Sequence, residues 1–225
     1  MNIETTPVPE ANLSAIEARI LGCLMEKQRT TPDTYPLTLN ALVTACNQKT
    51  SRHPVMHLET GEVGHTVNQL RDRELILASF SGRTERYDHR MASHFHLNPQ
   101  EQALICTLVL RGPQTLGELR TNAGRMAQFA DLSSVESFIH GLMERKKPLV
   151  TRLPRLPGKR EERFGQLLCG EVEQEVPEPS ATTARGAKDE RIAALEAEVS
   201  RLSAELKRLW ELTGYAEQRP RPESE

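Results

Sequence analysis

The sequence predicts a mainly α fold with small β wings (α+β), in which one arrangement of elements occurs twice. Three observations carry this prediction. On each side of Asn98-Pro99, three segments with apolar residues at helical spacing precede two short extended segments around a polar turn. The shared order indicates an internal repeat. Near the C-terminus, apolar residues spaced alternately three and four apart predict a separate amphipathic helix.

The first half, residues 12–98, opens with a helix. Ser14 and Glu17 form a Ser-x-x-Glu capping box, which marks a helix start. Later, Val63, Val67 and Leu70 are spaced as the buried face of another helix. The elements that follow the first helix are a second helix (38–47), a third helix from residue 62, a strand (75–80), a polar hairpin (81–90) and a returning strand (94–97).

The second half, residues 99–170, repeats this order. Its first helix spans 100–111, and Thr115 with Glu118 forms a capping box before the second. Ser133 and Glu136 are the predicted cap of the third helix. The remaining elements are a strand (148–153), a polar hairpin (154–162) and a returning segment (163–169).

Three helices followed by a strand, a hairpin and a strand are typical of a winged helix-turn-helix domain. We therefore predict tandem winged-helix domains at 12–98 and 99–170, each with its third helix as the recognition helix and its hairpin as the wing. The alternative is two α+β domains without winged-helix geometry. Composition predicts disorder at 1–11 and 213–225, and a flexible linker rich in Glu, Pro, Ser, Thr and Ala at 171–187.

Residues 188–212 are predicted to form an amphipathic, heptad-patterned helix. β-branched residues at a and Leu at d favour a parallel coiled-coil dimer. The alternative is a helix that folds back on its own body. The positions of the seam are Ile192, Leu195, Val199, Leu202, Leu206 and Leu209.

Composition excludes several classes of protein. No run of 18 apolar residues occurs, which excludes a membrane span. The first twelve residues lack the basic and apolar regions of a secretory signal. Four scattered cysteines without a Cys-x-x-Cys pair are typical of reduced thiols, so we expect a cytoplasmic protein.

Several long blocks of sequence carry a family resemblance. They include EARILG (17–22), YPLTLNAL (35–42), CNQKTSRHPVM (46–56) and LRGPQT (110–115). With these blocks in order, the chain resembles the YceH family of bacterial proteins over about residues 13–169. The resemblance implies tandem winged-helix domains, and it implies no enzyme activity and no ligand.

Basic residues concentrate around the second wing. Between residues 145 and 163, eight basic residues stand against two acidic ones, and such side chains neutralise nucleic-acid phosphates. The alternative is a solvated wing without a partner. On the first recognition helix, His65, Thr66, Asn68, Gln69 and Asp72 should face outward. Amides there can read adenine edges, whereas the carboxylates of Glu62 and Asp72 would repel phosphates. The nucleic-acid-binding candidates are Lys146, Lys147, Arg152, Arg155, Lys159, Arg160, Arg163, Asn68, Gln69, Arg83 and Arg86.

The loop at 47–56 is long for a helix-turn-helix turn. Loops on rigid scaffolds often carry function, so Lys49, Arg52 and His53 are candidates for binding a partner. The alternative is a structural loop whose residues 54–56 fill the core.

Motifs for catalysis and for metal binding are missing from the sequence. No phosphate-binding glycine loop and no nucleophile motif occurs, and nothing pairs carboxylates such as Glu26 and Asp33. His94 and His96 would share a strand face, but neither a cysteine pair nor His-Glu-x-x-His accompanies them. We expect no catalytic residue, no cofactor and no metal.

The sequence therefore predicts a non-enzymatic tandem winged-helix protein that is DNA-associated and regulator-like. The basic wing of the second domain would contact the phosphates of double-stranded DNA. The alternative is a protein–protein interaction scaffold that uses winged-helix surfaces without DNA binding, which the acidic residues of the recognition helices favour. No membrane partner is expected, and the heptad helix predicts a homodimer.

Overall fold

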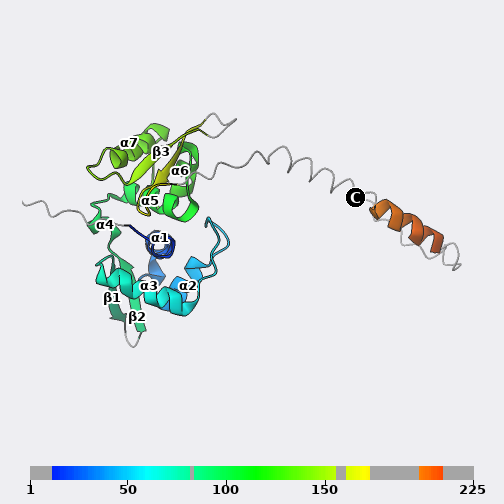
Figure 1. Cartoon of the computed structure of the whole chain (residues 1–225), viewed down its shortest axis with the longest axis horizontal. Coiled ribbons are helices and arrows are strands. Elements are labelled where there is room, and N and C mark those ends of the chain that lie inside the picture. The colour runs from blue at the N-terminus through cyan, green and yellow to red at the C-terminus, as the bar shows by residue number, and fades with distance from the viewer. Residues whose placement is uncertain (1–11, 82–83, 156–160, 173–197, 210–225) are drawn as a thin grey trace, which may run out of the picture. The chain divides into compact units, whose positions relative to one another are not determined.

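The computed structural model of the chain describes residues 12–81, 84–155, 161–172 and 198–209 (Figure 1). The chain forms two units, residues 1–174 and 175–225. Several predicted features lie outside the described residues: both terminal segments, most of the linker, Arg83, Lys159, Arg160, Ile192 and Leu195.

The first unit is mainly helical with two small antiparallel strand pairs, as predicted. Its first half contains α1 (Ala15–Thr30), the 3-10 turn η1 (Pro32–Thr34), α2 (Leu39–Cys46), α3 (Thr60–Asp72), β1 (Ile76–Ser81), β2 (Thr84–His89) and α4 (Met91–His94). Its second half contains α5 (Pro99–Arg111), α6 (Leu116–Ala123), α7 (Leu132–Met143), β3 (Val150–Leu153) and β4 (Arg163–Gln166). We call β1–β2 the first hairpin and β3–β4 the second hairpin.

Each hairpin is tied to the segment that precedes the second long helix of its own half. Leu37, just before α2, forms a β-bridge with Tyr87 of β2. Gln114, just before α6, forms the corresponding bridge with Phe164 of β4. Both bridges consist of two backbone hydrogen bonds of 2.8–3.2 Å. The repeat seen in the sequence therefore extends to the pairing of the backbone.

Two of the three side-chain caps that the sequence predicts occur in the structure. Ser14 and Thr115 form the two predicted capping boxes. The predicted cap of the last long helix is wrong, because Asp131 caps α7 and its carboxylate accepts the backbone N–H of Ser134 at 2.7 Å. Asp is as good an N-cap as Ser, and here it stands two residues before Ser133.

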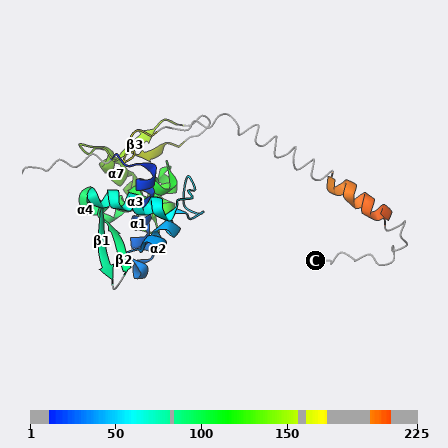
Figure 2. The same cartoon turned by 60° about the horizontal axis from the view of Figure 1, so that its bottom comes forward.

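The returning strand of the first hairpin lies earlier than predicted. The segment predicted as a polar turn contains β2, and the predicted strand at 94–97 begins in the short helix α4. The polar sequence of β2 is misleading because a two-stranded sheet has a solvent face: Tyr87 and His89 are buried while their neighbours are not. His96 has a φ of 49°, which a strand does not accommodate. Figures 1 and 2 show the first hairpin projecting from the body.

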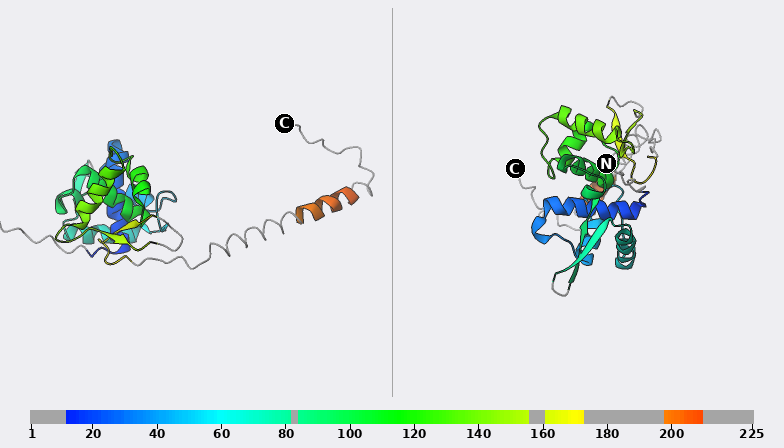
Figure 3. Two further views of the ribbon diagram at one scale, coloured as in Figure 1. Left: turned by 90° about the horizontal axis from the view of Figure 1, so that it is seen from above. Right: turned by 90° about the vertical axis from the view of Figure 1, so that its left-hand side faces the viewer.

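Both halves share one hydrophobic core, and α1 lies at its centre (Figure 3). This helix contacts α2 and α3 of its own half and α5 of the other. Gly22 permits the close approach to α5, because a Cβ there would lie 2.8 Å from Leu110 Cδ2. The Cys106 thiol of α5 also donates to the Gly22 carbonyl oxygen at 3.3 Å. The two halves therefore pack as a single body.

In the second unit, residues 198–209 are helical, as the heptad pattern predicts. The seam residues within this stretch, Val199, Leu202, Leu206 and Leu209, are exposed. Across the part of the chain that the structure describes, no helix is long and apolar enough to span a membrane.

Candidate functional site

The second hairpin carries two exposed arginines that share one carboxylate. Glu162 lies 3.2 Å from the guanidinium of Arg152 and 3.2 Å from that of Arg155. Arg152 also reaches Nε2 of His140 on α7 at 3.2 Å and lies over the ring of Phe164. Exposed ion pairs of this kind contribute little to stability.

Two other basic residues of this region bind the protein itself. Arg145 pairs with Glu101 at 2.9 Å and donates to the Phe95 carbonyl oxygen at 2.5 Å. Arg163, a predicted phosphate ligand, donates to the Pro113 carbonyl oxygen at 2.5 Å. Arg145 therefore ties the second half to the end of the first, and Arg163 ties the second hairpin to the segment before α6. Lys146 and Lys147 lie between α7 and β3 and are exposed.

The exposed face of α3 is polar and nearly neutral. His65, Asn68 and Gln69 are exposed as predicted, but Thr66 is buried and the prediction for it is wrong. Its hydroxyl donates to the backbone carbonyl one turn earlier, which lets a polar side chain lie against the core. Arg71 donates to Asn68 at 3.3 Å.

Other predicted candidates are less open to a ligand. Arg86 of the first hairpin is half-buried and donates to the Pro36 carbonyl oxygen at 2.8 Å. On α7, Glu136 and Ser137 are exposed, and Glu144 at the end of this helix is exposed too, so the helix that the sequence predicts as a second recognition helix presents carboxylates.

The loop between α2 and α3 holds an arginine inside the protein. Arg52 was a candidate for binding a partner, but its side chain is fully buried. Lys49 and His53 are exposed, as such a role requires. The structural alternative, with residues 54–56 in the core, is also wrong, because Pro54 and Val55 are exposed.

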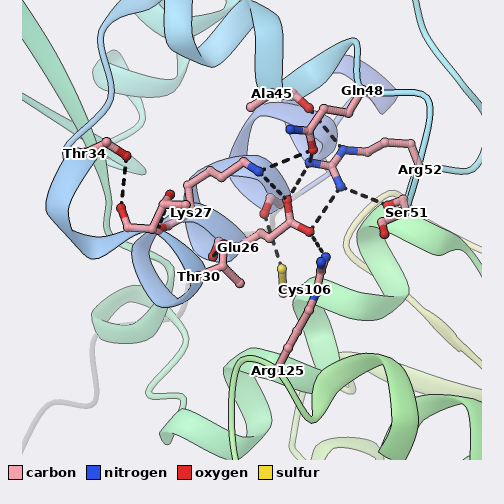
Figure 4. A network of polar contacts seen from close by, with 12 residues as sticks. Glu26, Lys27, Thr30, Thr34, Ala45, Gln48, Ser51, Arg52, Cys106 and Arg125 are labelled. Carbon is pink, nitrogen blue, oxygen red and sulfur yellow. Dashed lines mark hydrogen bonds and ion pairs between the residues drawn. The ribbon is translucent and has the colours of Figure 1, made fainter.

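Glu26 of α1 is the centre of a buried polar network (Figure 4). Its carboxylate accepts Arg52 at 2.6 Å, and Lys27 lies 3.5 Å away. Arg125, from the segment between α6 and α7, bonds the other carboxylate oxygen. The Arg52 guanidinium also donates to Gln48 and to the carbonyl oxygens of residues 45 and 51. The network joins α1, the loop after α2 and the second half of the protein.

Burial and charge act in opposite directions on Glu26. Burial alone raises the pKa of this carboxyl, but the hydrogen bonds and charge of Arg52, followed by the charges of Arg125 and Lys27, outweigh it. The pKa of Glu26 therefore lies below its ordinary value. Burial likewise lowers the pKa of Arg52, and the pairing with Glu26 reverses that effect. Both groups are charged at neutral pH.

A second arginine from the other half lies beside this network. Arg111, the last residue of α5, donates to the hydroxyl of Ser51 at 2.7 Å. Burial and then the positive charge of Arg125 lower the pKa of Arg111. Neither Arg111 nor Arg125 is marked by any spacing in the sequence, since both lie far along the chain from Glu26. Only the packing of α5 against α1 brings them together.

Another buried polar cluster joins the halves through His89. Its Nε2 lies 3.0 Å from Gln28 of α1 and 3.2 Å from Gln102 of α5, and its Nδ1 accepts the Met91 N–H at 3.2 Å. Burial lowers the pKa of His89 to about 4. The imidazole is therefore neutral at pH 7.

Metal-ligating groups do not converge in the described ranges, where no cluster of three or more His, Cys, Asp or Glu side chains could hold an ion. Cys23, Cys46 and Cys106 are free thiols in the core, and Cys169 is exposed. The two histidines expected to share a strand face lie in and after α4 instead, because that strand does not form.

Residues 13–159 match a family described as "Protein of unknown function, DUF480". A UPF0502 protein of Geobacter sulfurreducens is 50% identical over 199 residues, which cover 86% of this chain and 91% of the relative. A UPF0502 protein of Delftia acidovorans is 47% identical over 220 residues and 95% of each chain. One from Burkholderia orbicola is 47% identical over 210 residues, covering 91% of this chain and 88% of the relative.

Proposed function

The chain belongs to the DUF480 (UPF0502) family of bacterial proteins, of which YceH is also a member, and we propose that it is a non-enzymatic, cytoplasmic protein that associates with double-stranded DNA. The proposal treats each half as a winged helix. It is supported by the element order and by the matching bridges Leu37–Tyr87 and Gln114–Phe164, which attach each hairpin to its helices in the same way.

The observation that carries the proposal is the surface of the second hairpin. Arg152 and Arg155 are exposed on it, and among the described side chains Glu162 bonds both. Lys146 and Lys147 precede β3 and are exposed too. Guanidinium groups bind phosphate oxygens in a bidentate manner, and phosphate contacts position a protein on a duplex. If a duplex lies along this hairpin, its phosphates replace Glu162 as the partners of the two arginines.

Base contacts belong to α3 in this proposal. Asn68 and Gln69 are adjacent, exposed and amide-bearing, and amides can pair with the adenine edge in the major groove. On α7 the carboxylates of Glu136 and Glu144 would be repelled by a duplex. We therefore assign phosphate contacts to the second half and base contacts to the first.

Fluorescence anisotropy of a labelled mixed-sequence duplex tests the proposal. The double variant Arg152→Gln/Arg155→Gln should bind at least tenfold more weakly than the wild type, since each charged contact contributes of the order of 1 kcal/mol. The matched control is Arg201→Gln, which removes an exposed arginine from the second unit. Equal affinity in the wild type and the hairpin variant would reject the assignment of phosphates to this hairpin.

A protein-interaction scaffold is the second candidate, and one observation favours it. Phe80 and Leu77 of the first hairpin are 75% and 52% exposed. Phe80 lies near the tip of this hairpin, and aromatic side chains are enriched among the residues that anchor protein–protein contacts. Under this candidate, Phe80→Ser would abolish capture of a protein partner, and the duplex would bind neither the wild type nor the variant.

A further inference from the structure

Three cations contact one buried carboxylate at the seam between the halves, and a fourth is bonded to the loop that supplies Arg52. Arg52, Arg125 and Lys27 all lie within ion-pair distance of Glu26. Arg111 adds a fourth positive charge, and it donates to the neutral hydroxyl of Ser51 rather than to an acid. The five groups have a combined formal charge of +3, which is large for partly buried side chains.

Such crowding of like charges has a physical cost. Burial removes water from the guanidinium groups, and neighbouring cations oppose one another. The lowered pKa of Arg111, which arises from burial and then from Arg125, reflects this cost. A further negative charge beside Arg111 and Arg125 would relieve it.

The backbone around Ser51 is fixed before any ligand arrives. Ser51 has a φ of 60°, in the left-handed region, and the next residue is anchored through the buried Arg52 side chain. The His53 N–H donates to the Leu110 carbonyl oxygen at 2.8 Å, which fastens the loop to the end of α5. The Ser51 hydroxyl is therefore held against Arg111.

The side chains of the cations differ in their exposure to solvent. The Arg52 side chain is fully buried, Arg111 is half-buried, and 47% of the Arg125 side chain is exposed. Arg125 is therefore the cation most open to solvent, while Arg52 and Glu26 are the buried members of the cluster.

We propose that this cluster binds the phosphate group of a small molecule, with the phosphate between Arg111 and Arg125 and beside the Ser51 hydroxyl. A phosphate suits the cluster better than a carboxylate does. It brings up to two negative charges and three acceptor oxygens, and the planar fork of arginine matches its geometry. None of these residues belongs to the second hairpin, and the proposal does not depend on the DNA proposal.

Titration calorimetry with inorganic phosphate and with pyrophosphate tests the site, at an ionic strength held constant with sodium chloride. The wild type should bind both, and Arg111→Gln and Arg125→Gln should each weaken binding at least tenfold. Arg155→Gln, which removes an exposed arginine of the second hairpin, should bind like the wild type. No heat with the wild type at 10 mM of either anion, or equal affinity in all variants, would overturn the proposal.

Ser51→Asp and Ser51→Asn provide a test that does not remove an arginine. Both side chains tolerate the left-handed backbone at this position, and they differ only in charge. Ser51→Asp should raise the Tm in the absence of phosphate and abolish phosphate binding, whereas Ser51→Asn should do neither. Equal Tm values for the two variants would overturn the proposal.

A binding measurement with duplex DNA distinguishes a site for a small phosphate ligand from a site for the phosphates of DNA. Duplex DNA should bind Ser51→Asp as it binds the wild type, because the arginines assigned to the duplex, Arg152 and Arg155, do not belong to the cluster. If Ser51→Asp weakened duplex binding while inorganic phosphate gave no heat with the wild type, the cluster would be a contact for the DNA backbone and the small-molecule proposal would fail.

Discussion

Glu26 connects three segments that are distant in the sequence. It receives Arg52 from the loop after α2, Arg125 from beyond α6, and Lys27 from its own helix. Removing one partner of a buried ion pair leaves the other charges unpaired, which costs more than the pair itself contributes. The sequence shows Glu26 as one carboxylate among many, because nothing in a linear pattern marks a partner 99 residues away.

Glu26→Gln should lower the free energy of unfolding by about 3–5 kcal/mol, since it leaves Arg52 buried without a counter-charge. Urea denaturation at pH 7 measures this. The matched control is Glu62→Gln, an exposed carboxylate at the start of α3, which should change stability by less than about 0.5 kcal/mol. A similar small loss in both variants would show that the network does not hold the fold.

His89 makes stability depend on pH in the acid range. Its pKa falls from an ordinary value of about 6.5 to about 4 on folding, so the unfolded chain binds a proton first as the pH drops. This contribution is complete above pH 6.5 and declines by about 3 kcal/mol as the pH falls to 4. His89→Gln should flatten the stability profile between pH 6.5 and 4, as measured by urea denaturation at several pH values. The exposed His65→Gln should leave the slope unchanged, and an unchanged slope in His89→Gln would contradict the assignment.

At the scale of elements, amphipathic spacing and caps predict most of the fold. The buried triads of α3 and α7, and the boxes at Ser14 and Thr115, occur as the sequence indicates. Errors arise where local signals compete. Asp131 precedes Ser133 as a cap, and the polar strand β2 resembles a turn because one face of its sheet meets solvent and the Leu37 bridge that also holds it comes from far along the chain.

Asp131→Ala should lower the free energy of unfolding by about 1 kcal/mol, because the amide of Ser134 loses its acceptor at the start of α7. Ser133→Ala is the control, since Ser133 is exposed within the first turn and Asp131 supplies the cap. Thermal unfolding of the two variants measures the difference. A larger loss in Ser133→Ala would reinstate the cap predicted from the sequence.

At the scale of the whole molecule, the repeat is visible in the sequence but the joining of its halves is not. Nothing in the sequence distinguishes Gly22 from any other residue of its helix. In the structure, its lack of a side chain permits α1 and α5 to pack closely. The Arg111–Ser51 and Arg125–Glu26 contacts follow from that packing. Sequence patterns report which face of a helix is buried, and they do not report which other helix covers it.

The exposed apolar residues of the second unit predict self-association. Val199, Leu202, Leu206 and Leu209 continue the heptad, and a parallel dimer would cover them. Light scattering after size exclusion should give twice the chain mass of 25.3 kDa for the wild type, and the chain mass for Leu202→Lys/Leu209→Lys. Ser203→Lys, off the seam, should remain dimeric. A monomeric wild type would favour the fold-back alternative.

The salt dependence of duplex binding tests the DNA proposal most directly. The logarithm of the binding constant should fall linearly with the logarithm of salt concentration, by about 0.9 per phosphate contact. The double variant Arg152→Gln/Arg155→Gln should have a slope smaller by about 2 than the wild type, because two phosphate contacts are lost. A slope that is the same in both proteins, or no binding of the wild type even at low salt, would contradict the account.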